Sequence, residues 1–199
     1  MKTFAVEAKS RTIADNSADQ KRALKALRNN NEVPAVLYGG EGVVHLSVAR
    51  DAVRNLIYTP SVYLVELSID GNKKMAILKD MQFQPVTDEL LHIDFQEISK
   101  DKPVVIEIPV ALEGYAEGVK AGGKLTLRMR KLKVKALYEK LPEKLVINVS
   151  SLGLGKSMQI GELNFDGLEL MNAKNAVVCT VQLTRAARGA AAAAASGKK

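Results

Sequence analysis

Three cations at helical spacing are the first residues in this sequence whose types suit a chemical role. Lys21, Lys25 and Arg28 stand four and three positions apart, and in a helix this spacing places them within about 60° of one face. Side chains so arranged can reach a sugar-phosphate backbone together, and the arginine adds a bidentate donor. The solvated face of an ordinary amphipathic helix has the same pattern. Both interpretations stay open on the spacing alone.

A second group of cations lies in the stretch KLTLRMRKLKVKAL, where apolar and basic residues alternate. The alternation predicts a basic pair of strands from Lys124 to Leu137, with a β-bulge at Arg130-Lys131 that keeps the cations on one solvent face. Such a face suits phosphates, although lysines on edge strands also prevent aggregation between sheets. The candidate secondary contacts are Lys124, Arg128, Arg130, Lys131, Lys133 and Lys135.

Several motifs resemble catalytic sites but lack an essential residue. Gly118, Gly123 and Lys124 have the spacing of a phosphate loop, yet Leu125 replaces the magnesium-binding Ser or Thr and a strand pattern follows. The sequence Gly155-Lys156-Ser157 has Ser150 where the first glycine belongs. Two distant histidines and one cysteine make no zinc set, and Cys179 lies in an apolar run typical of a core. We therefore expect no enzyme, no metal and no cofactor.

The elements that carry these residues alternate between strands and helices in the first half of the chain. Ser17 and Gln20 form a capping-box signature for a helix over residues 18–30, and Thr59-Pro60 closes a second helix over residues 49–58. The turn Asp70-Gly71-Asn72 predicts a hairpin between extended runs from Val62 to Phe83. Further strands are expected over residues 4–9, 33–38, 44–48 and 90–95. This half has the pattern of a small mixed barrel.

A polar break over residues 99–103 separates this half from a run that alternates at period two from Val104. We expect domains over residues 1–98 and 103–184, the second with strands near 145–149 and 176–183 and all β in character. After Arg185 the sequence becomes AARGAAAAAASGKK, which predicts a disordered, basic, alanine-rich tail over residues 185–199. The predicted fold class is mainly β with some α.

Composition narrows the function to binding of a polyanion. The chain has 199 residues, of which 29 are Lys or Arg and 22 are Asp or Glu, for a net charge of +7. Aromatic residues make up only 5%, which disfavours successive base stacking on a single strand and favours shaped RNA held by its phosphates. No apolar run reaches the roughly 18 residues of a membrane span, and the N-terminus lacks a signal-peptide pattern. We expect a cytoplasmic protein with no membrane partner.

Two motifs in fixed order resemble a known family. The stretches KRALKALRNNNEVPAVLYGG and LLHIDF are similar to the 5S-rRNA-binding ribosomal protein twenty-five of the large subunit. The stretch GYAEGVKAGGKLTLRMRKLKVKAL resembles the longer, two-domain branch of that family, known as CTC or general stress protein. The resemblance implies a six-stranded antiparallel β-barrel with helices, similar to the anticodon-binding barrels of glutaminyl-tRNA synthetase. It also implies docking on the loop E region of 5S rRNA.

Carried over by position, the resemblance implies a set of RNA-binding residues: Arg11, Lys21, Lys25, Arg28, Tyr38, Gln82, His92 and Asp94. The basic side chains would hold phosphates, while the others would meet riboses and base edges. His92 and Asp94 stand two residues apart, so in a strand they share a face. The family's glycine-flanked lysine before the helix is replaced by Asp19-Gln20-Lys21-Arg22-Ala23, and Lys25 stands where many relatives have arginine.

The resulting expectation is a structural constituent of the large ribosomal subunit that binds 5S rRNA in translation, bound to the ribosome beside neighbouring ribosomal proteins and without a small-molecule substrate. One alternative is a freestanding RNA-binding stress factor or tRNA-binding module, which the same charge and the synthetase-like barrel would suit. A small nucleotide-using enzyme resting on Gly118 to Lys124 is the third hypothesis. Co-sedimentation with large subunits separates the first two, and nucleotide binding tests the third.

Overall fold

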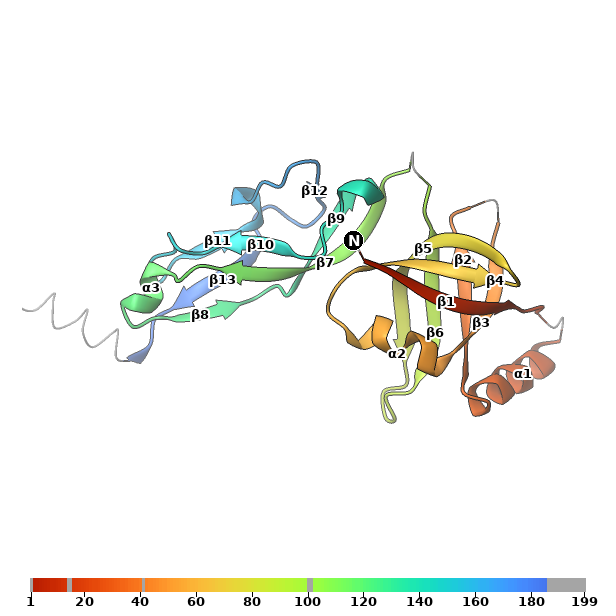
Figure 1. Cartoon of the computed structure of the whole chain (residues 1–199). Coiled ribbons are helices and arrows are strands. Elements are labelled where there is room, and N and C mark those ends of the chain that lie inside the picture. Colours follow the sequence, from red (N-terminus) through yellow and green to blue (C-terminus); the bar gives the residue numbers. More distant parts are fainter. Residues whose placement is uncertain (1, 14–15, 41, 100–101, 186–199) are drawn as a thin grey trace, which may run out of the picture. The chain divides into compact units, whose positions relative to one another are not determined.

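The computed structural model describes residues 2–13, 16–40, 42–99 and 102–185, and it separates into two compact units (Figure 1). The first comprises Met1–Val104 with Leu137–Glu143 and is called the barrel unit here. The second comprises Val105–Ala136 with Lys144–Lys199 and is called the C-terminal unit. The predicted tail, apart from Arg185, lies outside the described residues.

The barrel unit is built on six strands that close into a barrel, as predicted. Valine, leucine and alanine alternate with other residues along these strands, and period-two alternation places them on the inner face. Val33, Ala35 and Leu37 of β2 are fully buried in this way, as are Ile93 and Phe95 of β6. In barrel order the strands are β1 (Lys2–Ser10), β3 (Val44–Ala49), β2 (Glu32–Tyr38), β6 (Leu90–Glu97), β5 (Asn72–Phe83) and β4 (Tyr63–Ile69).

The expectation that this barrel is antiparallel throughout is wrong for two of its pairings. Strands β1 and β4 run parallel, and so do β2 and β6. Strands joined by short turns, such as β4 and β5, are forced to be antiparallel, whereas parallel neighbours need a long crossover. The segments between β1 and β4 and between β2 and β6 supply that length. The barrel therefore combines parallel and antiparallel pairs.

The hairpin between β4 and β5 has the turn that its sequence predicts. Asp70 and Gly71 both have positive φ, 48° and 92°. Two such residues make a type I′ turn, whose twist matches that of the flanking strands. The register is thereby set from Ile69 opposite Asn72 to Leu64 opposite Ile77.

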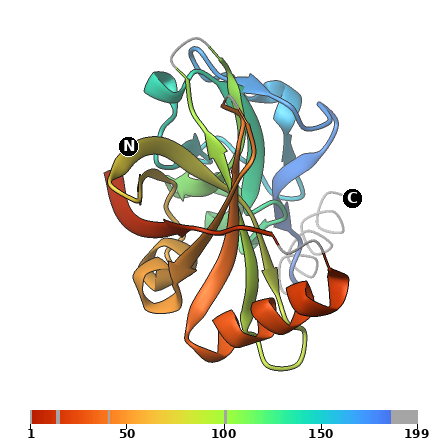
Figure 2. The same cartoon turned by 90° about the vertical axis from the view of Figure 1, so that its right-hand side faces the viewer.

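The first helix, α1, covers Ser17–Asn29 and lies on the outside of the barrel against β2 (Figure 2). Its N-cap is Asn16, whose Oδ1 accepts from the Ala18 N–H at 3.2 Å, so the expected Ser17–Gln20 capping box is wrong by one residue. Asparagine in extended conformation places a side-chain oxygen over the free N–H groups of the first turn. No residue of α1 is buried, and only Gln20, Leu24, Leu27 and Arg28 are half-buried.

The second helix, α2, covers Arg50–Tyr58 and buries Val53 and Leu56 in the barrel core. It ends at Thr59, immediately before Pro60, as predicted. Proline disfavours helical conformation in the residue before it, so the helix stops there.

The C-terminal unit is almost wholly β. Its four-stranded sheet has the order β10 (Leu145–Asn148), β7 (Val104–Glu113), β9 (Lys131–Ala136) and β12 (Glu169–Leu170). Its three-stranded sheet has the order β11 (Ser157–Gln159), β13 (Val177–Gln182) and β8 (Lys124–Leu127). The short helices are α3 (Glu117–Lys120) and η2 (Ile160–Glu162), while η1 (Tyr138–Lys140) lies in the segment that belongs to the barrel unit. The mainly β fold class is confirmed.

The basic stretch from Lys124 to Leu137 does not form one pair of strands. Strand β8 pairs with β13 in one sheet, whereas β9 lies in the other sheet. The irregularity is at Arg128-Met129, whose two N–H groups both point to the Val178 carbonyl, at 2.8 and 3.2 Å. The changed alternation therefore marks the passage of the chain between sheets rather than a bulge at Arg130-Lys131. The expected single solvent face of cations is wrong.

Candidate nucleic-acid interface

Polar side chains gather on the outer face of the barrel where β2, β6 and β5 lie side by side. Because Leu37, Ile93 and Phe95 point into the core, their neighbours Tyr38, His92, Asp94 and Gln96 point outward. The register sets Gln82 of β5 opposite His92, and Asp80 opposite Asp94. Four of the predicted RNA-binding residues thus lie on one surface, called the β6 face here: Tyr38, Gln82, His92 and Asp94.

The imidazole of His92 is oriented by a direct contact with Asp94. Its Nδ1 lies 2.7 Å from Asp94 Oδ1, and the two side chains are 25% and 33% exposed. A carboxylate at this distance accepts a hydrogen bond from the Nδ1–H group, which keeps the proton on Nδ1 and so fixes the tautomer of the ring. The other nitrogen, Nε2, is then left for a ligand. The pair presents one ring nitrogen and one carboxylate edge to whatever binds this face.

Tyr38 contributes a hydroxyl that remains protonated. Burial raises the pKa of its phenol, and the negative charges of Asp94 and Asp80 raise this pKa further. The hydroxyl therefore keeps both donor and acceptor capacity over the physiological pH range. A neutral group of this kind suits a ribose or a phosphate oxygen.

The helix cations divide into one anchored arginine and two free lysines. Arg28 donates from Nη2 to the Leu91 carbonyl at 3.1 Å, and its Nε is buried without a hydrogen-bond partner. Lys21 and Lys25 are exposed, and no carboxylate of a described residue lies within ion-pair distance of either. The bond to Leu91 fixes the C-terminal end of α1 beside the residue that precedes His92. The basic helix α1 and the β6 face are therefore adjacent.

Arg11 follows the end of β1 and lies in one register row with residues of the β6 face. Its N–H donates to the His45 carbonyl at 2.8 Å. His45 is opposite Val36, and Val36 is opposite Asp94. Sequence reasoning did not select His45 as a site residue. The side chains of Val44, Leu46 and Val48 point into the core, so the period-two alternation of a strand places His45 on the outer face.

The secondary cations of the C-terminal unit are not equivalent. Lys133 lies 3.8 Å from Glu107, and Lys135 lies 3.4 Å from Glu169, so both have carboxylate neighbours across the sheet. The remaining four are exposed and have no carboxylate within ion-pair distance among the residues described: Lys124, Arg128, Arg130 and Lys131. The latter group is the better candidate for phosphate binding.

The residues that imitated catalytic motifs have structural roles. A Cβ at Gly118 would lie 2.6 Å from the Gly153 carbonyl carbon, and one at Gly123 would lie 2.6 Å from the Gly118 carbonyl oxygen. The glycines therefore allow close packing of loops, and a strand begins at Lys124 where a phosphate loop needs a helix. Cys179 is fully buried, as predicted. Within the described ranges, no group of three or more metal-ligating side chains occurs, and no helix is long and apolar enough to cross a membrane.

The barrel unit thus carries an anchored basic helix beside a polar outer face, an arrangement whose charge and shape suit a polyanion. Residues 6–95 match the model of the Ribosomal L25p family, and residues 103–185 match that of the Ribosomal protein TL5, C-terminal domain. The chain therefore belongs to the ribosomal L25p family, in its longer form with the TL5 C-terminal domain. This family consists of ribosomal structural proteins and not of enzymes, as the sequence predicted.

Individual relatives match this chain over nearly its whole length. It is 73% identical over 192 residues to the large ribosomal subunit protein bL25 of Parabacteroides distasonis. The matched residues make up 96% of this chain and 99% of the relative. The protein of the same name from Bacteroides fragilis is 64% identical over 194 residues, with 98% and 99% covered. That from Porphyromonas gingivalis is 60% identical over 193 residues, with 96% and 98% covered.

Proposed function

We propose that this chain is a structural constituent of the large ribosomal subunit and that its barrel unit binds 5S rRNA at the loop E region. Membership of the ribosomal L25p family supports the ribosomal role and the association with rRNA. Relatives that match nearly the whole of this chain are named as large-subunit proteins. The identity of the rRNA rests on the sequence motifs and on the geometry of the β6 face.

The observation that carries the proposal is the hydrogen bond from Arg28 to the Leu91 carbonyl. It places the basic face of α1 beside His92 and Asp94, so that one ligand can meet both. Cations bind the phosphate backbone without regard to sequence, whereas groups such as an oriented imidazole and a carboxylate can select base edges. The arrangement therefore combines positioning with recognition.

Each residue has a role that follows from its surroundings. Lys21 and Lys25 are exposed and hold phosphates, while Arg28 offers its remaining N–H groups from a fixed position. Arg11 supplies a further cation from the register row that contains Asp94. Tyr38, Gln82, His92 and Asp94 meet riboses and base edges in a wide, shallow groove.

For the C-terminal unit we propose secondary rRNA contacts through the exposed cations at the passage between its sheets. Arg128, Arg130 and Lys131 lie there, and Lys124 lies at the start of β8. Lys133 and Lys135 contribute less, because Glu107 and Glu169 already oppose their charge. We propose that residues 1–98 and 103–184 are the two functional domains.

A binding experiment with a 5S rRNA transcript tests the site. The wild-type protein is expected to bind the transcript and a loop E fragment, and the double variant Lys21→Ala with Arg28→Ala is expected to bind both more weakly. The slope of log affinity against log salt should flatten by roughly 0.7 to 0.9 for each phosphate that the variant no longer holds. The variant Lys102→Ala with Lys140→Ala removes the same charge from exposed sites away from α1 and serves as the control. Equal binding by both double variants contradicts the site.

Sedimentation separates the ribosomal role from that of a freestanding RNA-binding stress factor or tRNA-binding module. A ribosomal constituent is expected to move with the large subunit on a sucrose gradient at physiological salt. A freestanding factor would stay near the top of the gradient, and that result contradicts the proposed role.

A further inference from the structure

The outer face of α2 carries two arginines and a tyrosine that the proposed function does not use. Arg50, Arg54 and Tyr58 follow each other at intervals of four, which puts them along one side of the helix. Val53 and Leu56 occupy the opposite side and are buried in the core. Tyr58 is 69% exposed, although a large aromatic side chain usually covers more of its surface. This side is called the α2 stripe here.

The α2 stripe begins where the basic helix α1 ends. The N–H of Arg50 donates to the Asn31 carbonyl at 2.9 Å, and Asn31 Nδ2 donates to Asp51 Oδ2 at 2.9 Å. Asn31 follows α1 closely, so the C-terminal end of α1 and the first turn of α2 meet. Figure 1 shows both helices at the same end of the barrel.

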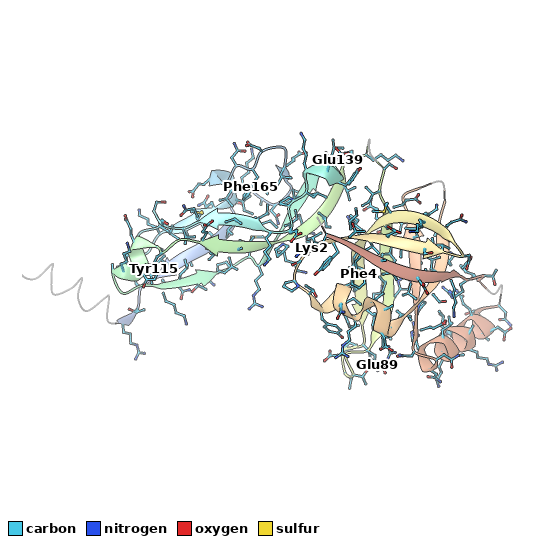
Figure 3. All side chains as sticks on the ribbon, in the orientation of Figure 1. Lys2, Phe4, Glu89, Tyr115, Glu139 and Phe165 are labelled. Carbon is cyan, nitrogen blue, oxygen red and sulfur yellow. The ribbon has the colours of Figure 1, made fainter. Side chains whose placement is uncertain are left out.

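Arg50 and Arg28 are held by the same short segment of chain. Arg28 donates to the Leu91 carbonyl, and Arg50 Nη1 lies 3.8 Å from an oxygen of Glu89, which is labelled in Figure 3. Among the residues described, the buried side-chain nitrogens without a hydrogen-bond partner are the Nε atoms of three arginines: Arg11, Arg28 and Arg50. The proposed function places the first two on RNA for other reasons. The Nε of Arg50 is buried in the same way, and this packing holds its guanidinium in place before a ligand binds.

The charge and the aromatic ring together favour RNA as the occupant of the α2 stripe. Glu89 opposes the charge of Arg50, but no carboxylate of a described residue lies within ion-pair distance of Arg54. An unopposed guanidinium attracts phosphate, and an exposed tyrosine four residues away offers a surface on which a ribose or an unpaired base can stack. A protein partner would more often meet an apolar patch than a cation of this kind.

We infer that the α2 stripe extends the 5S rRNA surface, with Arg54 on a backbone phosphate and Tyr58 stacked on a ribose or base beyond the segment held by α1. The inference rests on the proposed function, since it concerns the same RNA. It assigns a binding role to α2, which otherwise only fills one end of the barrel.

Single substitutions in the full-length protein test the two contacts. Arg54→Gln is expected to weaken binding to a 5S rRNA transcript and to reduce the salt slope by roughly 0.7 to 0.9. Tyr58→Ser is expected to weaken binding about fivefold or more with the salt slope unchanged, because stacking releases no counterions. Lys140→Gln and Tyr115→Ser are the matched controls, and both should bind like the wild type. Tyr115 is 61% exposed and lies in the C-terminal unit (Figure 3).

A hydroxyl-radical footprint locates the contact on the RNA. The wild-type protein is expected to protect a backbone segment next to loop E, and the variant Arg54→Gln with Tyr58→Ser is expected to lose that protection while loop E stays protected. Unchanged affinity and footprint in this variant overturn the inference. The proposed function still stands in that case, provided that Lys21→Ala with Arg28→Ala weakens binding. If the wild type binds no 5S rRNA, both proposals fail.

Discussion

Replacement of Arg28 by lysine separates the effect of its charge from that of its fixed position. Arg28 is half-buried, donates one N–H to the Leu91 carbonyl at 3.1 Å, and has further N–H groups for a ligand. Lysine keeps the charge, but its single nitrogen cannot hold the carbonyl and serve a phosphate in the same planar fork. The variant Arg28→Gln removes the charge as well.

The size of the effect follows from the hydrogen bond to the RNA that lysine cannot make while it holds the Leu91 carbonyl, because a bond lost within the protein is lost in the free and bound states alike. A hydrogen bond from a charged donor contributes about 1.5 to 3 kcal/mol, and the partly exposed position of Arg28 favours the lower value. Each 1.4 kcal/mol corresponds to a factor of about ten in affinity. Arg28→Lys is therefore expected to bind 5S rRNA about tenfold more weakly, with the salt slope unchanged. Arg28→Gln is expected to weaken binding further and to reduce the slope by roughly 0.7 to 0.9.

Fluorescence anisotropy with labelled 5S rRNA at four or five salt concentrations measures both quantities. Arg22→Lys is the matched control, because Arg22 lies on the same helix but is exposed and, among the residues that the structure describes, pairs only with Asp19, at 3.7 Å. Wild-type affinity in Arg28→Lys would show that charge alone matters and that the bond to Leu91 has no part in binding. A wild-type salt slope in Arg28→Gln would show that Arg28 holds no phosphate.

Three further predictions concern the fold itself. The buried Cys179 thiol, whose pKa is raised by burial and by Glu162, should react with a thiol reagent at neutral pH only as fast as the C-terminal unit opens; immediate labelling of the native protein contradicts this burial. Gly71→Ala should lower the free energy of unfolding by about 1 to 2 kcal/mol in a urea titration, since its φ is 92° in open space; an unchanged free energy means that the turn differs. The pKa of Tyr38 is raised in the folded protein, so the protonated phenol stabilises the fold below the unfolded pKa of about 10, and this stability is lost as the pH rises through the folded pKa. The variant Tyr38→Phe should therefore show a smaller loss of stability in thermal melts at high pH. An unchanged pH dependence in this variant contradicts the prediction.

Local patterns predicted most elements of the barrel unit, because each depends on residues close in sequence. The turn at Asp70-Gly71 and the stop before Pro60 are examples, since backbone conformation at these positions decides them. Strand direction was not predictable in the same way. Alternation of apolar residues is identical in parallel and antiparallel strands, so the parallel pairing of β1 with β4 left no trace in the sequence.

The limits of prediction were similar at the candidate site. Helical spacing placed Lys21 and Lys25 on an exposed face, but it grouped them with Arg28, which the barrel half-buries and anchors. A helix pattern shows which residues share a face and not which carbonyl of another element lies beside that face. For the same reason His45 and the α2 stripe were missed, since their neighbours come from distant parts of the chain.

The parallel pairing of β2 with β6 has a consequence for the order in which the ribosome makes this chain. Strand β6 begins at Leu90, and one helix and four strands lie between it and α1 along the chain. Until it emerges, α1 has no Leu91 carbonyl to attach to, and the outward row of His92 and Asp94 does not exist. A partly synthesised chain therefore has a charged helix without the surface that goes with it. Completion of the barrel and completion of the β6 face therefore coincide.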